Sequence, residues 1–83
     1  MYRILTEYKN IEGVNNTLLG LGLLNYTLYF GKGSWNGHSE KSLIIELDNI
    51  TKGLARRAAR SIKALNKQEK VLLQEIPVTS QLV

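Results

Sequence analysis

The spacing of hydrophobic residues changes along this chain of 83 residues, and those changes constrain its fold more than any other feature. Alternation over residues 2–8, YRILTEY, predicts a strand, and further strands are predicted at residues 25–31, 42–48 and 70–76. Helical spacing appears in two other segments, one after Asn10 and one from Lys52 to about Leu65. The predicted order of elements is therefore strand, helix, strand, strand, helix, strand.

This order, joined by right-handed crossovers, predicts an α+β fold of the ferredoxin-like βαββαβ type, in which two helices cover one face of a four-stranded antiparallel sheet. A chain of this length is expected to form a single domain, residues 1–83. The uncovered face is expected to carry Arg3, Leu5, Glu7, Tyr29, Ile44, Glu46, Leu72 and Gln74. Because that face mixes apolar and polar residues, we expect copies of the chain to associate through it.

Positive charge is concentrated in one segment of the chain. Seven of the eleven basic residues fall between Lys52 and Lys70, whereas the net charge of the whole chain is only +4. On a helix, Arg56, Arg60, Lys63 and Lys67 would share one side and could bind an anion, a phosphate backbone or an acidic partner protein. The alternative is a solvated helix face whose long side chains cover apolar surface.

The segment between the two middle strands, GKGSWNGHSE at residues 31–40, is the second candidate site. Its glycines would let the backbone approach a phosphate, and Trp35 could stack on a base. The candidate ligand-binding residues are Lys32, Gly33, Trp35 and His38. The alternative is a flexible hairpin tip whose Trp35 packs on its own subunit or on a neighbour.

No residue pattern indicates catalysis or metal binding. His38 and Glu40 could act together as a general base, with the carboxylate supporting the histidine. No nucleophile accompanies them, and the chain has no cysteine. Glu46 and Asp48 share a strand face and are expected to meet water or a cation of a neighbouring subunit. We therefore expect no enzyme activity, no cofactor and no metal. No apolar run is long enough to cross a membrane, so we expect a cytoplasmic chain.

Two short patterns resemble known proteins. Gly33, Trp35 and Gly37, followed by SLIIEL and by VLLQEIPV, resemble the trimeric ferredoxin-like proteins of the CutA and nitrogen-regulatory PII class. The stretch GKGSWNGHSEKSLIIEL also resembles small proteins of tailed bacteriophages. The first resemblance implies a homotrimer with ligand clefts between subunits. The second implies a viral accessory or anti-defence role.

Together these observations predict a non-enzymatic, homo-oligomeric binding protein that recognises an anionic, nucleotide-like small ligand or a partner protein. The alternative is a nucleic-acid-binding regulator that uses the basic helix at residues 52–70. A third interpretation is a small hydrolase or isomerase that uses His38.

Overall fold

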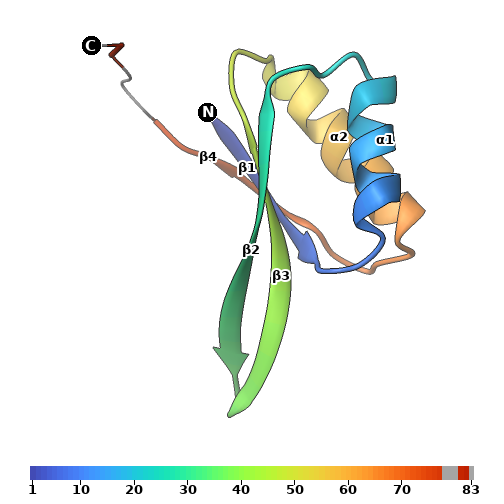
Figure 1. The fold of residues 1–83 in the computed structure, drawn as a ribbon, viewed down its shortest axis with the longest axis vertical. Coiled ribbons are helices and arrows are strands. Elements are labelled where there is room, and N and C mark those ends of the chain that lie inside the picture. The colour runs from blue at the N-terminus through green and yellow to red at the C-terminus, as the bar shows by residue number, and fades with distance from the viewer. Residues whose placement is uncertain (78–80, 83) are drawn as a thin grey trace.

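The computed structural model describes residues 1–77, 81 and 82, and of Trp35 it describes the backbone alone. The elements are β1 (Tyr2–Glu7), α1 (Ile11–Gly20), β2 (Tyr26–Trp35), β3 (His38–Leu47), α2 (Lys52–Leu65) and β4 (Leu72–Glu75). The strands form one antiparallel sheet in the order β2-β3-β1-β4. Both helices lie on the same face of this sheet (Figure 1). The predicted α+β, ferredoxin-like fold class is thus confirmed.

The register of the sheet assigns each strand residue to one of its two faces. Ile4 of β1 lies opposite Ile45 of β3 and Leu73 of β4, and this row faces the helices. The next row, on the uncovered face, places Arg3 opposite Glu46 and Gln74. Because side chains alternate along each strand, the eight residues expected on the uncovered face do lie there. We call this surface the open face.

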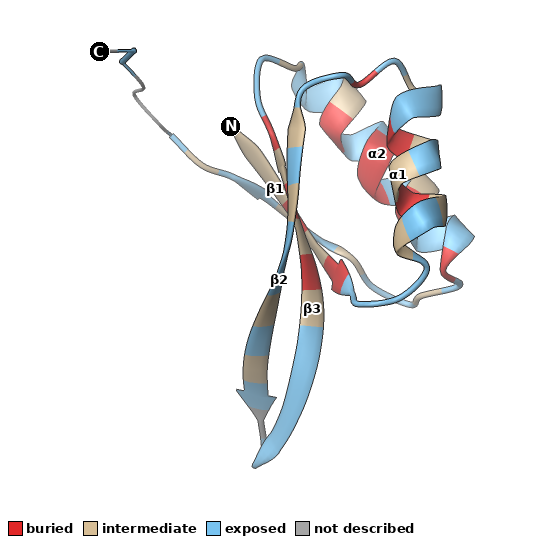
Figure 2. Cartoon of the chain, viewed as in Figure 1, coloured by how far each residue is buried: buried red, intermediate tan, exposed pale blue. Residues whose placement is uncertain are grey.

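The core lies between the helices and the sheet, where Figure 2 shows the buried positions gathered. Its largest fully buried side chains are Ile4, Val14, Leu18, Ile45, Leu47 and Ile62. Helix α2 turns Ala55 and Ala58 inward, and these small residues let its backbone approach β1 and β4 closely. The opposite side of α2 consists of polar and charged residues, as its helical spacing predicts.

Helix α2 is shorter than the basic segment. Its N-terminus is capped by Thr51, whose side chain accepts a hydrogen bond from the backbone N–H of Leu54 at 3.2 Å. The helix ends at Leu65, and Lys67 has a left-handed backbone with φ of 52°. Lys67 and Lys70 therefore lie in the connection to β4, and the prediction that they continue the helical row is wrong.

The glycine-rich segment expected to be a loop forms strand instead. Strands β2 and β3 stay paired until Trp35 lies opposite His38, and only Asn36 and Gly37 form the turn. Both turn residues have positive φ, 51° and 81°, which is the conformation that an Asn-Gly hairpin turn requires. The paired strands continue beyond the body of the molecule as a two-stranded arm, residues 31–42 (Figure 1).

Among the described residues, no helix has the length and hydropathy needed to span a membrane.

The core predicts a large effect for one substitution. Ile45 is fully buried in β3 between Ile4 and Leu28, so Ile45→Ala should lower the free energy of unfolding by about 2–5 kcal/mol. Urea denaturation followed by circular dichroism measures this change. Leu24→Ala is the matched control, because Leu24 is 79% exposed and its truncation should cost little. Equal losses in the two variants would contradict the assigned core.

Candidate functional site

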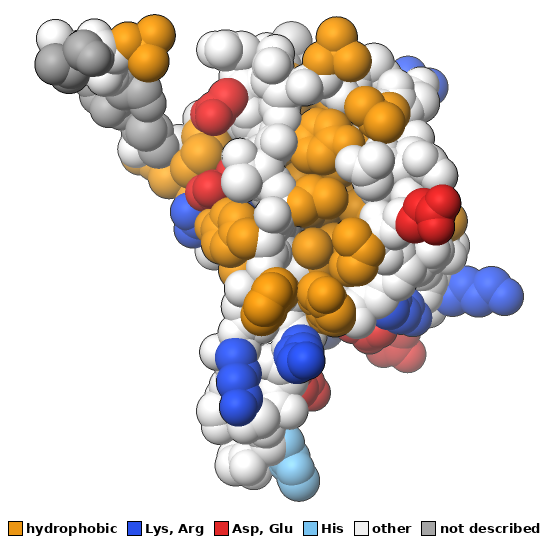
Figure 3. All heavy atoms as spheres, viewed as in Figure 1, with side chains coloured by type: hydrophobic (Ala, Val, Ile, Leu, Met, Phe, Trp, Pro, Cys, Tyr) orange, Lys and Arg blue, Asp and Glu red, His pale blue; other side chains and the backbone are white. Residues whose placement is uncertain are grey.

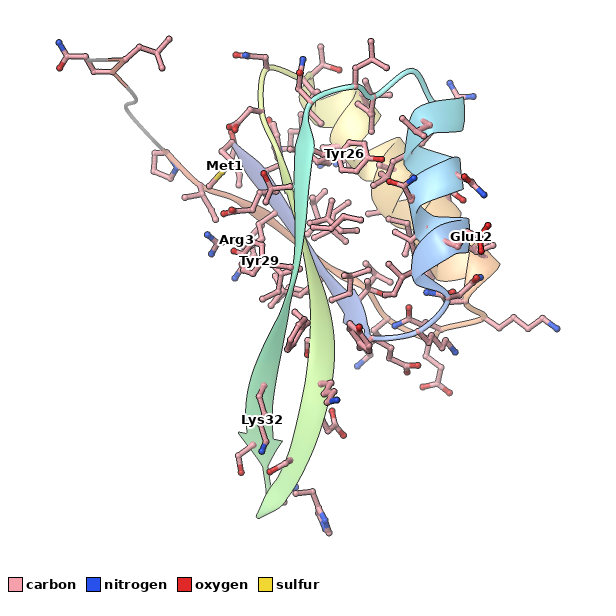
Figure 4. The ribbon with its side chains drawn as sticks, viewed as in Figure 1. Met1, Arg3, Glu12, Tyr26, Tyr29 and Lys32 are labelled. Atoms are coloured by element: carbon pink, nitrogen blue, oxygen red, sulfur yellow. The ribbon has the colours of Figure 1, made fainter. Side chains whose placement is uncertain are left out.

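The centre of the open face holds a polar cluster of Arg3, Glu46 and Tyr29. Arg3 of β1 donates from Nη2 to Oε2 of Glu46 on β3 at 2.8 Å. Their side chains are 32% and 23% exposed, so the ion pair is partly shielded from water yet reachable. Figure 4 shows Arg3 and Tyr29 together on the side of the sheet away from the helices. Three different strands hold the cluster, which makes it rigid.

The positive charge of Arg3 is retained within this cluster. The hydrogen bond that Arg3 donates to Glu46 raises the pKa of Arg3, partial desolvation opposes that effect, and Tyr29 adds a smaller contribution that raises the pKa. Arg3 therefore stays protonated at any physiological pH. Its Nε–H is buried and has no acceptor within the described residues. The ion pair also leaves Oε1 of Glu46 without a hydrogen bond to any described residue. Oε1 of Glu46 could therefore accept a hydrogen bond from a ligand, whereas the Nε–H of Arg3 is too buried for a ligand to reach.

A hollow of about 510 Å³ adjoins the cluster along the sheet. It is lined by Leu5, Thr6, Glu7, Glu40, Lys41, Ser42, Gln68, Lys70 and Leu72. Leu5 and Leu72 belong to the row next to Arg3, and Glu7 and Glu40 extend the same face toward the arm. The open face thus combines a guanidinium at one end, an apolar middle and two carboxylates at the other end.

The residues predicted to bind a ligand lie on the arm rather than with this cluster. Lys32 lies opposite Lys41, Gly33 opposite Glu40, and Trp35 opposite His38. Along β2, Trp35 is six residues beyond Tyr29, which corresponds to roughly 20 Å of strand. Alternation also puts Lys32 on the opposite face of the arm from Gly33. Gly33, Trp35 and His38 therefore share one face near the tip of the arm, with Trp35 and His38 directly opposite each other, whereas Lys32 lies on the other face. The side chain of Trp35 lies outside the described part of the chain.

The predicted anion-binding residues are divided by the end of α2. Arg56, Arg60 and Lys63 are exposed on the helix, whereas Lys67 follows it. The ion pairs within the described ranges are Arg3–Glu46 and Lys9–Glu7, so none of these four cations is paired there. Arg60 and Lys63 line a second hollow, of about 470 Å³, with Ala59, Glu69, Lys70, Val71 and Leu72.

Arg56 lies near a tyrosine on the helix-covered face. The hydroxyl of Tyr2 donates to Oε1 of Glu75 at 3.5 Å, across the β1–β4 pair. Burial raises the pKa of Tyr2, the charge of Glu75 raises it further, and the positive charge of Arg56 partly lowers it. This is a local structural contact at the end of the sheet, and it lies on the face opposite the Arg3 cluster.

The Arg3 cluster was missed as a site, although its members were expected on one face. Alternation placed Arg3, Tyr29 and Glu46 together, but it does not say which residue of β3 lies opposite Arg3. The expectation that Glu46 meets water or a neighbouring subunit's cation is wrong, because its partner is Arg3 of the same chain. Asp48 lies beyond the end of β3, not beside Glu46 in the strand. Within residues 1–77, 81 and 82, no three histidine or acidic residues gather closely enough to hold a metal ion.

Comparison with known proteins identifies a similar fold. No protein-family model matches the sequence. No curated protein sequence matches it either. Among solved structures, a phage SAM lyase in its apo state is similar, with a TM-score of 0.65 and 22% sequence identity. The match covers 87% of this chain and 74% of the lyase chain. At this identity the similarity demonstrates the shared fold.

This finding corrects two predictions made from the sequence. The chain was expected to be a non-enzymatic binding protein, with a nucleic-acid-binding regulator as the alternative, and not to be an enzyme. The similar structure is that of an enzyme, and this finding contradicts the prediction that the chain has no enzyme activity. The predicted connection with phage proteins agrees with the similarity, whereas the resemblance to the CutA and PII class stays a prediction.

The Tyr2–Glu75 contact predicts how stability depends on pH. Because the pKa of Tyr2 in the folded chain lies above its usual value of 10.0, Tyr2 of the unfolded chain ionises first as the pH rises. Its contribution to stability is complete below pH 10.0 and is lost as the pH rises through the folded-state pKa. Tyr2→Phe and Glu75→Gln should each reduce the loss of stability above pH 10.0 relative to the unmodified chain, as measured by urea denaturation. An unchanged pH profile in both variants would contradict the contact.

Proposed function

We propose that this chain is an enzyme that cleaves a sulfonium substrate of the S-adenosylmethionine type as a lyase, and that the open face is its active site. The single observation that carries the proposal is the partly exposed Arg3–Glu46 ion pair beside Tyr29, on a fold shared with a phage SAM lyase. An anti-defence role follows from this activity, because removal of S-adenosylmethionine would deprive host methyltransferases of their methyl donor.

The charges of the open face complement this substrate. S-adenosylmethionine carries a positive sulfonium, a positive amino group and a negative carboxylate. Arg3 could bind the carboxylate through the exposed guanidinium N–H groups that its bond to Glu46 does not use, since a guanidinium binds carboxylates strongly. Glu46 and the ring of Tyr29 would stabilise positive charge, the first through its carboxylate and the second through a cation–π interaction. In the adjoining hollow Glu40 offers a further carboxylate, while Glu7 is paired with Lys9, and Lys41 and Lys70 balance the charge of the lining.

The chemistry needs orientation and charge stabilisation more than a strong nucleophile. In a lyase reaction the bond between sulfur and the amino-acid arm breaks, and both bond electrons move to sulfur, which leaves as a neutral thioether. As this bond breaks, a base removes a proton from the neighbouring carbon and a double bond forms in the arm, or the arm's own carboxylate oxygen bonds to the carbon that sulfur leaves and closes a ring. Glu46 could take the proton in the first case, and Arg3 would orient the carboxylate in the second.

Self-association is part of this proposal. In a single chain the open face is exposed, with Tyr29 38% and Leu72 52% accessible, whereas cleavage of a charged substrate is favoured where water is excluded. A second copy covering this face would bury the apolar residues and enclose the Arg3 cluster. We propose a homo-oligomer whose substrate sites are covered by a neighbouring subunit.

The activity is tested directly on the purified chain. Incubation with S-adenosylmethionine should consume the substrate and release a neutral thioether, detected by chromatography with mass spectrometry. The two routes yield isomeric second products, which NMR distinguishes. Glu46→Gln should slow the reaction by about 10²-fold or more, because the change removes the carboxylate charge and keeps the shape.

Glu12→Gln provides the matched control, because it is the same chemical change on the exposed side of α1, away from the open face (Figure 4). Its rate should equal that of the unmodified chain, and circular dichroism should confirm that both variants fold. Absence of turnover in the unmodified chain would contradict the lyase function. Full activity of Glu46→Gln would instead contradict the assignment of the open face as the active site.

Oligomerisation is tested by native mass spectrometry and by light scattering. We expect more than one copy per particle, and Leu72→Glu should shift the population toward monomer, because it places a charge in the exposed apolar row. The same substitution at Leu24, which is exposed elsewhere, should leave the assembly intact. A strict monomer at high protein concentration would contradict the covered-site arrangement.

A further inference from the structure

Strand β4 presents unpaired backbone groups at the outer edge of the sheet. The backbone N–H of Ile76 donates to the carbonyl oxygen of Met1 at 2.8 Å, and the amino group of Met1 donates to the carbonyl oxygen of Ile76 at 3.2 Å. In an antiparallel ladder, hydrogen-bonded and non-hydrogen-bonded pairs alternate. Continuing from this pair, Gln74 and Leu72 bond to β1, whereas the N–H and C=O groups of Leu73 and Glu75 point outward. This edge could therefore accept one more strand.

A basic hollow lies beside the start of this edge. Helix α2 packs on β4, and the hollow of about 470 Å³ between them has an apolar floor of Ala59 and Val71. Arg60, Lys63 and Lys70 surround it, and Glu69 is the one acidic residue in its lining. Because Arg60 and Lys63 have no ion-pair partner among the described residues, this wall of the hollow carries uncompensated positive charge.

We infer that an acidic segment of a partner protein docks here in extended conformation, pairs with the outer edge of β4 and places its carboxylates against Arg60 and Lys63. Two residues of β4 offer only a few backbone hydrogen bonds, which is too little for stable binding without further contacts. The cations supply attraction and set the orientation of the added strand. Lys70 and Leu72 line both this hollow and the one on the open face, whereas Arg60 and Lys63 line this hollow alone, and the inference does not depend on the proposed lyase activity.

The observations favour a peptide over a nucleic acid. A strand edge recognises backbone amides, which a nucleic acid lacks, and the hollow has an apolar floor that suits an aliphatic side chain. Helix α2 has no aromatic residue on which a base could stack. Lys70 and Pro77 flank β4 and confine the added strand to a short segment, because proline ends the run of available donors.

The test uses a short fluorescein-labelled peptide of alternating glutamate and valine, whose binding to the whole chain is followed by fluorescence anisotropy. We expect saturable binding that weakens with added salt. Arg60→Gln combined with Lys63→Gln should weaken it about tenfold. A version of the peptide that is N-methylated on every backbone nitrogen should lose binding, because it cannot donate to the edge of β4.

Lys52→Gln combined with Arg57→Gln is the matched control. It removes the same charge from the same helix, but neither residue lines the hollow. Binding by this variant should change less than threefold, since distant surface charges contribute weakly. Equal weakening by the two double variants, undiminished binding of the N-methylated peptide, or no saturable binding below about 1 mM would each overturn the inference. Tighter binding of a single-stranded oligonucleotide of equal charge, lost with Arg60 and Lys63, would assign the surface to nucleic acid instead.

Discussion

The pairing of β1 with both of its neighbours is the interaction on which the rest of the structure depends. β1 lies between β3 and β4, and its register with them determines what each face of the sheet presents. Ile4 enters the core in a row with Ile45 and Leu73, so Arg3 must emerge on the opposite face in a row with Glu46. A slip of one residue would reverse both assignments. The same register thus creates the core and the candidate site.

The open face joins two properties that a small domain seldom combines. Its ion pair is held by strands whose backbones are fixed on both sides, so Arg3 and Glu46 keep their geometry without a ligand. The neighbouring residues Tyr29 and Leu72 remain partly exposed. A separate group of hydrophobic side chains lies at the surface over β2, toward the helices, as Figure 3 shows. A rigid polar pair beside apolar surface is a suitable site for a charged organic substrate, once water is excluded.

The fold class was predictable because the periods of hydrophobicity report the faces of helices and strands. Leu43, Ile45 and Leu47 alternate and are all buried, and the helix from Lys52 ends where its pattern weakens. The arm was not predictable in this way, because residues 36–41 and the other described polar side chains near its tip are exposed and show no alternation of buried residues. The strands continue there since Asn36 and Gly37 form a tight turn, and an Asn-Gly pair was visible in the sequence as a signal for that turn.

The sequence by itself determined the order of elements, the composition of the open face and the accumulation of cations on α2, because these follow from local spacing. Only the tertiary structure decided that Arg3 meets Glu46, that the ligand-binding candidates are spread along an arm, and that Arg60 and Lys63 adjoin the edge of β4. These facts depend on contacts between segments far apart in the chain. Alternation specifies a side of a strand, whereas register and helix placement come from the packing of the whole core.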